Sequence, residues 1–284
     1  MPSNAEERVA EALGSGVARS GPLSGGCIGE VYRMDLEDGR AVVVKVADGG
    51  GTLDIEGYML QYLGEHSDLP VPAVHLSEPG LLIMDYAEGD SRFGKAEQTH
   101  AAELLAALHG VKAQRHGLER DTLIGGVHQP NPWTDSWLAF FAEHRLIFMA
   151  EEAARAGQCG QDLVKRVRNF ADGLDKFLQE PPHPSLLHGD VWTTNVLAHR
   201  GRITAFLDPA VYYGHPEVEL AFTTLFGTFG EPFFQRYHEL RPIPDGFFEV
   251  RKDIYNLYPL LVHTRLFGGG YASSVSSTLK RHGY

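Results

Sequence analysis

The stretch that decides the fold is His188-Gly189-Asp190-Val191-Trp192-Thr193-Thr194-Asn195, and Phe206-Leu207-Asp208-Pro209 follows it. Phosphoryl transfer from ATP requires a carboxylate that accepts the proton of the attacking hydroxyl. It also requires an amide oxygen and a second carboxylate that hold Mg²⁺ against the nucleotide phosphates. The order and spacing of these residues therefore predict Asp190 as the catalytic base, and Asn195 and Asp208 as the metal ligands.

The sequence between these residues predicts how they come together. Apolar runs at 195–198 and 202–207 predict two short strands, and residues 199–201 predict the turn that joins them. Such a hairpin would bring Asn195 and Asp208 to adjacent strand ends, close enough to share metal ions. The alternative is an ordinary loop at 188–190 and an ordinary turn at 208–209, but both halves in this order favour the catalytic interpretation.

A glycine-rich segment near the N-terminus predicts a loop that binds phosphate. It lies between two apolar runs that predict strands, and glycine permits both positive φ and a close approach of the backbone to phosphates. Gly26, Gly29 and Val31 match the pattern G-x-G-x-x-G-x-V, whereas Ser24 replaces its first glycine. The residues expected at the nucleotide are Gly25, Gly26, Cys27, Ile28, Gly29 and Val31.

A lone lysine, Lys45, interrupts the apolar strand predicted at 41–46. Burying an ammonium group is costly unless the group is paired. We expect two partners: the α- and β-phosphates of the nucleotide, and Glu56 on a helix predicted at 53–63. The alternative is that Lys45 lies on an edge strand and reaches solvent.

The run at 81–87 predicts the last strand of an N-terminal sheet and a hinge that follows it. The backbone of Asp85 and Ala87 would hydrogen-bond the adenine, and Met84 would face the back of the adenine pocket. Ordinary core packing is an equal alternative for Met84, because methionine fills irregular gaps.

The remaining sequence predicts an α+β, bilobal protein-kinase-like fold. Residues 1–88 would form a small N-lobe with an antiparallel β-sheet, and residues 89–284 a larger, mainly helical C-lobe, with the site in the cleft between them. Ser3 and Glu6 resemble a capping box for a first helix. Later helices are expected at 95–111, 133–156, 162–178, 216–226, 232–240, 247–267 and 271–282.

The composition argues against several classes of partner. The 284 residues carry a net charge of −12 without a long basic cluster, so neither nucleic acid nor an anionic membrane is an expected partner. No apolar run approaches the length of a membrane span, and the N-terminus lacks the pattern of a secretory signal. These features predict a soluble, cytoplasmic protein.

Two cysteines, Cys27 and Cys159, are too few for a disulfide framework or a metal cluster. Cys27 would lie in an exposed turn near Lys45, and thiolate reactivity depends on exposure and on nearby positive charge. We therefore expect Cys27 to be a redox-sensitive thiol, which forms a sulfenic acid or links two monomers into a homodimer. The alternative is an inert small residue that fits the turn.

Several motifs resemble one group of small-molecule kinases. His188-Gly189-Asp190 and Asp208-Pro209 are similar to the aminoglycoside and choline phosphotransferase side of the kinase fold. Longer segments resemble the fructosamine (ketosamine) kinase family, and these lie at 131–146, at Trp192, at 208–221 and at 257–271. Val191 and the pair at 193–194 depart from the Leu and Ser-Gly that are usual in that family, and this leaves substrate detail open.

The resemblance implies a kinase that uses ATP and Mg²⁺ to phosphorylate the 3-hydroxyl of ketosamines, the sugar adducts of amines and lysine side chains, after which the product releases the free amine. Substrate contacts are expected from Trp133, Trp192, Tyr213 and His215. Trp192 could stack on the sugar or the cationic amine, or could instead plug the space under the catalytic loop. Which sugar is used, and whether the amine is protein-bound, stay open.

Other polar residues near these motifs are expected to be structural. Glu219 would accept backbone N–H groups of the catalytic loop. His188, His215 and His263 lack the spacing of a zinc site and are expected to be hydrogen-bonded. Two alternatives to a ketosamine kinase remain, namely a phosphotransferase for an aminoglycoside or choline, and a pseudokinase that binds nucleotide and serves as a scaffold.

Overall fold

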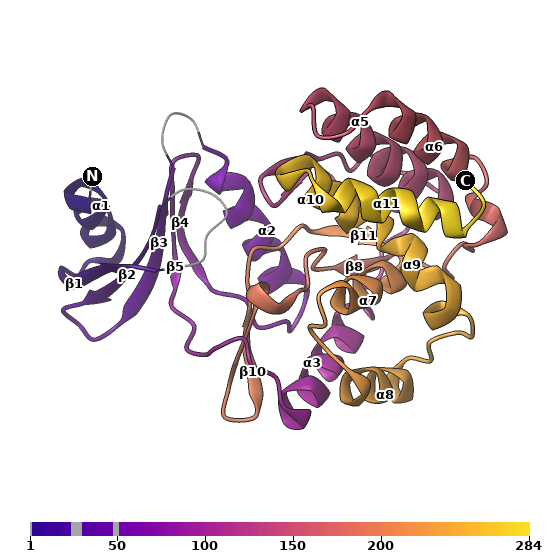
Figure 1. Cartoon of the computed structure of the whole chain (residues 1–284). Helices are drawn as coiled ribbons and strands as arrows, with labels where there is room; N and C mark the ends of the chain where they lie inside the picture. Colours follow the sequence, from indigo (N-terminus) through magenta and orange to yellow (C-terminus); the bar gives the residue numbers. More distant parts are fainter. Residues whose placement is uncertain (1, 24–29, 48–50) are drawn as a thin grey trace.

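The N-terminal part of the protein is an antiparallel sheet. The structure is a computed structural model that describes residues 2–23, 30–47 and 51–284 (Figure 1). Five strands pair in the order β1-β2-β3-β5-β4, and every pair is antiparallel. The strands are β1 (Val17–Pro22), β2 (Glu30–Leu36), β3 (Ala41–Val46), β4 (Val74–Glu78) and β5 (Leu81–Asp85). The sequence predicts an antiparallel sheet with strands at the places of β1, β2, β3 and β5, whereas β4 was not predicted.

Helices cover both faces of this sheet. Helix α1 (Pro2–Leu13) packs on one face, in the same apolar cluster as Val44. Helix α2 (Leu53–His66) packs on the other face, with Leu82. Because side chains alternate along a strand, Lys45 points to the face opposite Val44, toward α2. Helix α1 begins one residue before Ser3, so the predicted capping box does not mark its start.

Helices dominate the chain after β5, as the sequence predicts. The main ones are α3 (Lys95–Leu108), α4 (Trp137–Phe141), α5 (Phe148–Arg155), α6 (Gln161–Ala171), α7 (Pro216–Leu225), α8 (Glu231–Leu240), α9 (Lys252–Tyr255), α10 (Leu257–Phe267) and α11 (Gly270–Arg281). A π-helical turn, η1 (Ala142–Ile147), joins α4 to α5, and another, η4 (Phe247–Arg251), leads into α9. Among the described residues, no helix is both long and apolar enough to cross a membrane.

Three two-stranded pairs lie between these helices. Strands β9 (Val196–His199) and β10 (Arg202–Phe206) form the predicted hairpin, and both residues of its turn, Arg200 and Gly201, have the positive φ of a tight two-residue turn. Strand β8 (Ser185–Leu187) pairs with β11 (Tyr212–Gly214), on either side of that hairpin in the sequence. A further pair, β6 (Thr122–Ile124) and β7 (Val127–Gln129), was not predicted, because three-residue strands are too short to show a periodic pattern.

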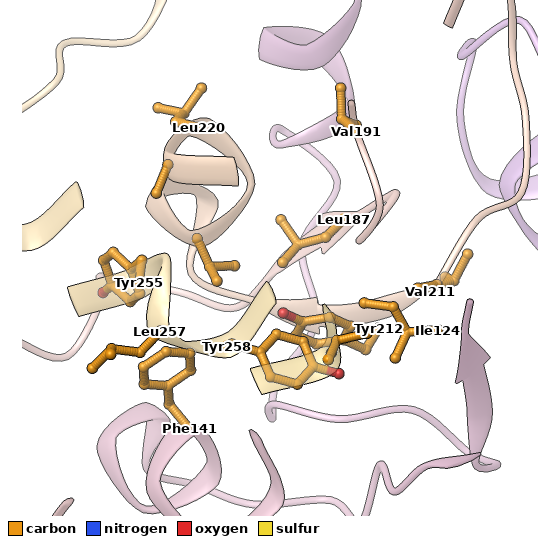
Figure 2. Packing of buried hydrophobic residues seen from close by; sticks show 14 of the residues in the cluster. Ile124, Phe141, Leu187, Val191, Val211, Tyr212, Leu220, Tyr255, Leu257 and Tyr258 are labelled. Carbon is orange, nitrogen blue, oxygen red and sulfur yellow. The ribbon is translucent and has the colours of Figure 1, made fainter. Parts of the chain in front are cut away.

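The largest apolar core lies among the helices and is rich in aromatic residues. Figure 2 shows part of it, in which Leu187 from β8, Tyr212 from β11 and Tyr258 from α10 belong to the same apolar cluster as Val191. Arg145 is fully buried in this core, with its guanidinium 4.0 Å from the centre of the Tyr212 ring. The catalytic loop lies against this packed core.

The guanidinium of Arg145 satisfies buried backbone and side-chain acceptors. It donates hydrogen bonds to the carbonyl of Pro130 at 2.8 Å and to Oδ1 of Asn131 at 2.6 Å. Asn131 in turn donates to the hydroxyl of Thr122 at 2.8 Å, at the start of β6. The buried arginine therefore holds the segment after β7 against the β6–β7 hairpin.

We predict that Arg145→Met lowers the free energy of unfolding by about 2–4 kcal/mol, because it leaves two buried acceptors without a donor. Urea denaturation of the parent and the variant measures the change. Arg145→Lys is the matched control, since it keeps the charge but not the planar array of donors, and it should recover only part of the loss. A Met variant as stable as the parent would contradict this role.

Candidate active site

The catalytic loop leaves β8 through a glycine that no other residue could replace without strain. Gly189 has a φ of 87°, and a Cβ atom at this position would lie 2.0 Å from the carbonyl oxygen of Ala210. The N–H of Ala210 donates to the carbonyl of His188 at 2.7 Å. The loop is therefore pressed against the segment that follows Asp208, which explains the glycine in His-Gly-Asp.

The predicted base and the predicted amide ligand are direct neighbours. Asn195 donates from Nδ2 to the carboxylate of Asp190 at 2.9 Å and to the Asp190 carbonyl at 3.0 Å. The N–H of Leu207 donates to the carbonyl of Asn195 at 2.8 Å, which ties the catalytic loop to the end of β10. The NH₂ group of Asn195 is used on Asp190, whereas its side-chain oxygen accepts a hydrogen bond from the Thr194 hydroxyl at 3.3 Å and keeps a second lone pair for another partner.

The carboxyl group of Asp190 binds a proton more tightly than an exposed aspartate. Burial raises its pKa well above the usual value, and the negative charge of Asp208 raises it further. The hydrogen bond from Asn195 acts in the opposite direction but does not cancel these effects. A carboxylate held in this way is oriented and basic enough to accept a proton from a hydroxyl group.

Lys45 joins the sheet, α2 and the segment at Asp208. Its ammonium lies 2.6 Å from a carboxylate oxygen of Glu56, and it also contacts the carboxylate of Asp208. Burial lowers the pKa of Lys45, but the two carboxylates outweigh burial and hold the pKa above its usual value, so the lysine stays charged. Strand β3 is flanked by β2 and β5, and Lys45 is buried, which argues against the alternative of an edge-strand lysine in solvent.

Asp208 adopts a backbone conformation that is uncommon for a residue with a side chain. Its φ is 50°, in the left-handed region that aspartate tolerates better than most residues. Within the described part of the chain, no cluster of three or more His, Cys, Asp or Glu side chains is arranged to hold a metal ion. The oxygens of Asp208 and Asn195 fit a hard cation such as Mg²⁺, which commonly takes one or two protein ligands and completes its shell with phosphate oxygens and water.

A buried carboxylate on α7 holds the catalytic loop through a hydrogen bond to its backbone. Glu219, on α7, accepts the N–H of Gly189 at 2.6 Å, which confirms the structural role predicted for it. His109 donates to the other oxygen of Glu219 at 2.9 Å, and the Tyr237 hydroxyl donates to the second ring nitrogen of His109 at 2.7 Å. This tautomer of His109 is the one that the carboxylate favours.

These groups face one cavity, which we call the catalytic cavity. The β6–β7 turn and the end of α10 line it together with the predicted residues, although neither was expected at the site. Its lining residues are Lys45, Glu56, Met59, Leu123, Ile124, Gly125, Gly126, Asp190, Trp192, Asn195, Asp208, Pro209, Val262, His263, Leu266 and Phe267. The glycine pair was the one available signal, because it marks a tight turn.

Of the four residues expected at the substrate, Trp192 alone lines this cavity. Its ring centre is 5.4 Å from that of Phe226 and 6.1 Å from that of His263. Trp133 and Tyr213 pack on each other with ring centres 6.4 Å apart, outside the lining of the cavity. Tyr213 is buried because β11 pairs with β8 inside the core, so its placement there corrects the expectation of a substrate contact.

His215 also proves to be structural. Its Nδ1 accepts the N–H of Glu217 at 3.1 Å and so caps the start of α7. The ring packs near Trp137 and Tyr255, and burial, followed by the charge of Arg251, lowers its pKa to about 3. His215 does not line the catalytic cavity, so the structure gives no support to the expectation that it contacts the substrate.

The hinge is consistent with the predicted use of its backbone. The N–H of Asp85 donates to the carbonyl of Ala73 at 2.9 Å, so this N–H is already used within the protein. Met84 is buried with Leu82 on the α2 face of the sheet, as core packing requires. Val31 lies opposite Lys45 in the β2–β3 register. The expected contacts of Gly25, Gly26, Cys27, Ile28 and Gly29 lie outside the described residues.

The cap at His215 predicts a pH dependence of stability. In the unfolded chain this histidine titrates near pH 6.5, but in the fold its pKa is about 3, so the unfolded chain binds more protons between these values. Its contribution is therefore present above about pH 6.5 and is lost as the pH falls toward 3. We predict that His215→Asn, which keeps an acceptor for the helix cap but does not titrate, loses less melting temperature over this range than the parent.

Thermal unfolding of both proteins across this pH range measures the difference. Asp190 and the other buried groups are the same in both proteins, so they cancel in the comparison. Parallel curves would contradict a titrating role for His215.

Comparison with known proteins places these features in a family. A family model described as fructosamine kinase matches residues 1–282. A protein of Synechocystis sp. assigned as a ketoamine kinase is 37% identical over 276 residues, which is 91% of this chain and 88% of that protein. A chloroplastic protein-ribulosamine 3-kinase of Arabidopsis thaliana is 30% identical over 285 residues, 95% of this chain and 84% of that protein.

Solved structures share the fold. A crystal structure of a protein from Thermobifida fusca assigned as a fructosamine-3-kinase has a TM-score of 0.87 and 30% identity, and the match covers 97% of this chain and 96% of that chain. The aminoglycoside phosphotransferase APH(4)-Ia, in a ternary complex with ADP and hygromycin B, has a TM-score of 0.65 and 21% identity, with 97% and 95% covered. The second likeness concerns the fold alone, and together they confirm the kinase-like fold that the sequence predicts.

Proposed function

The chain belongs to the fructosamine kinase family, and we propose that its catalytic cavity transfers the γ-phosphoryl group of ATP to the 3-hydroxyl of a ketosamine. The observation that carries this proposal is the Asp190 carboxylate, which Asn195 orients at 2.9 Å and which burial makes more basic. The acceptor hydroxyl gives its proton to Asp190 while its oxygen forms a bond to the γ-phosphorus. The bond between that phosphorus and the bridging oxygen breaks, and ADP leaves.

Lys45 is proposed to bind the α- and β-phosphates of ATP. Its ammonium is buried, charged and held by Glu56 at 2.6 Å, so it is positioned before the nucleotide arrives. The carbonyl of Asp85 and the N–H of Ala87 would hydrogen-bond the adenine, with Met84 behind it. Residues 25–29 and Val31 would cover the phosphates, as the glycine-rich pattern predicts.

Asp208 and Asn195 are proposed to hold Mg²⁺. Both offer oxygen ligands at the ends of neighbouring segments, and Asp208 lies within reach of the cationic group of Lys45. Magnesium bound there would supply positive charge against the phosphate oxygens during transfer. Asn195 directly precedes the β9–β10 hairpin and Asp208 closely follows it, so the hydrogen bonds of the hairpin hold both residues in place.

The acceptor is proposed to enter along an aromatic wall. Trp192, His263 and Phe267 line the catalytic cavity, and Phe226 packs beside Trp192. Aromatic faces suit both the apolar face of a sugar and the protonated amine of a ketosamine.

The proposal also includes a division into two lobes, at 1–88 and 89–284, and action in the cytoplasm. The division into lobes is supported by the catalytic cavity, which is lined by residues from β3 and α2 and by residues from the helical part.

Two variants separate the base from the metal ligand. Asp190→Asn should lower kcat by at least about 10²-fold, because it removes the proton acceptor, with little change in the affinity for Mg·ATP. Asp208→Ala should weaken Mg·ATP binding as well as turnover, because it removes the charged ligand. Calorimetry with Mg·ATP and an assay of ADP release test both variants. Near-parental turnover in the first, or unchanged Mg·ATP affinity in the second, would refute the assigned role.

A panel of acceptors tests the substrate class. We predict phosphate transfer to ribulose- or fructose-derived lysine adducts, and none to kanamycin or choline, because the wall of the cavity suits a sugar joined to an amine. Transfer to kanamycin or choline alone would favour the other phosphotransferase activity. Absence of transfer to every acceptor, with nucleotide still bound, would favour a scaffold.

Matched tryptophan variants connect this panel to the structure. Trp192→Ala should raise KM for the ketosamine at least about fivefold, as expected for the loss of about 1 kcal/mol of stacking or cation–π energy. Trp133→Ala is the control, because Trp133 lies outside the lining of the catalytic cavity and should leave KM unchanged. Equal effects of the two changes would contradict the placement of the acceptor.

A further inference from the structure

A second cavity lies behind the catalytic loop, on the other side of β8. We call it the rear pocket. It has a volume of about 570 Å³ and is lined by residues from 177–185, from the start of α7, which Figure 1 shows beside β8, and from the end of α8. Its volume falls in the usual range of small-molecule sites. It shares no lining residue with the catalytic cavity, so a ligand could occupy it while substrate is bound.

The rear pocket has hydrogen-bond donors that the described residues leave unused. Ser185 is completely buried, and its hydroxyl has no hydrogen-bond partner among the described residues. The Nε2 atom of His183, which also lines the pocket, is buried and likewise has no hydrogen-bond partner among the described residues. Burial lowers the pKa of His183, and the nearby charges of Lys112 and Arg241 lower it further. Buried polar groups are usually paired, so these groups indicate a missing partner.

Of the carboxylates around the rear pocket, one is paired with an arginine, one is hydrogen-bonded to a neighbouring helix and one lies at the rim. Glu217 accepts two hydrogen bonds from Arg251, at 2.6 and 2.7 Å. Glu180 accepts the hydroxyl of Ser136 and the N–H of Trp137, at the start of α4. Asp245 is exposed at the rim. In the part of the chain that the structure describes, Arg241 takes part in no ion pair, so its guanidinium group is available to an anionic ligand.

The walls of the rear pocket suit an organic ligand rather than a bare ion. Pro181, Pro242 and Pro244 provide rigid surface without N–H donors, and Leu240 adds an apolar side chain. A preformed pocket of this kind orders little on binding, which favours affinity.

A chain of hydrogen bonds leads from the rear pocket to the catalytic loop. Tyr237 lines the pocket, and its hydroxyl donates to His109 at 2.7 Å. His109 donates to Glu219 at 2.9 Å, and Glu219 accepts the N–H of Gly189 at 2.6 Å. Gly189 directly precedes the catalytic base. A ligand that shifts Tyr237 therefore acts on the group that holds the loop.

We propose that the rear pocket binds a small organic anion, with a phosphate or carboxylate group at Arg241, His183 and Ser185, and that its occupancy changes turnover through Tyr237, His109 and Glu219. The site is separate from the catalytic cavity. Binding at the rear pocket therefore does not depend on which acceptor the enzyme phosphorylates.

Binding is tested first in the Lys45→Met variant, which weakens the phosphate-binding part of the catalytic cavity. Fructose 6-phosphate, succinate and inorganic phosphate are titrated by calorimetry, and the melting temperature is followed in parallel. We expect saturable binding of at least one organic anion, weakened at least about tenfold by adding Arg241→Gln, the loss of one charged hydrogen bond. Binding of inorganic phosphate alone would overturn the organic class. Absence of binding, or binding that Arg241→Gln leaves unchanged, would overturn the site.

Coupling is tested in the enzyme with Lys45 intact. The anion that binds should change kcat at least about threefold in the parent, a modest coupling between two sites. In Arg241→Gln the ratio of kcat with and without the anion should fall to about 1, because the anion no longer binds. Tyr237→Phe removes the hydroxyl that begins the chain of hydrogen bonds, and it should still bind the anion but not respond to it. Binding without any effect on kcat in the parent, or a parental response in Tyr237→Phe, would refute the coupling.

Discussion

The buried ammonium of Lys45 is the interaction on which the site depends. It contacts Glu56 from α2 and Asp208 from the segment after β10, so one charge joins the sheet, a helix and the catalytic region. Removing an ammonium group from water is expensive, and the cost is offset only if its partners stay in place. A shift of α2 or of the segment at Asp208 would therefore leave a buried charge without a partner in an apolar environment.

The charges of the catalytic cavity are unbalanced without a nucleotide complex. Among the residues that the structure describes, three carboxylates, those of Glu56, Asp190 and Asp208, line it together with a single ammonium group. Burial and the negative charge of Asp208 raise the pKa of both Asp190 and Glu56. A cavity with this excess of negative charge is suited to a divalent cation, whose positive charge would also offset the phosphates of a nucleotide.

The catalytic loop is held from two sides, and the two supports have different chemistry. On one side, backbone and amide hydrogen bonds of Asn195 and Leu207 connect it to the β9–β10 hairpin. On the other side, the buried carboxylate of Glu219, which is hydrogen-bonded to His109, accepts the N–H of Gly189. The first support orients the base, whereas the second connects it to the helices behind it. Hydrogen bonds to a buried charged group are among the stronger ones, so the second support fixes the loop firmly.

The sequence by itself determined that Asp190, Asn195 and Asp208 lie together, and it determined the β9–β10 hairpin and the pairing of Lys45 with Glu56. Each of these depends on short spacings or on a local pattern, such as a lysine in an apolar strand. Only the tertiary structure decided that the β6–β7 turn and the end of α10 line the catalytic cavity, and that His215 caps a helix instead. It also decided that Arg145 lies in the core and that His109 supports Glu219, residues separated by 110 positions. Such contacts arise when distant segments pack to bury apolar surface, and burial of that kind leaves no local pattern in the chain.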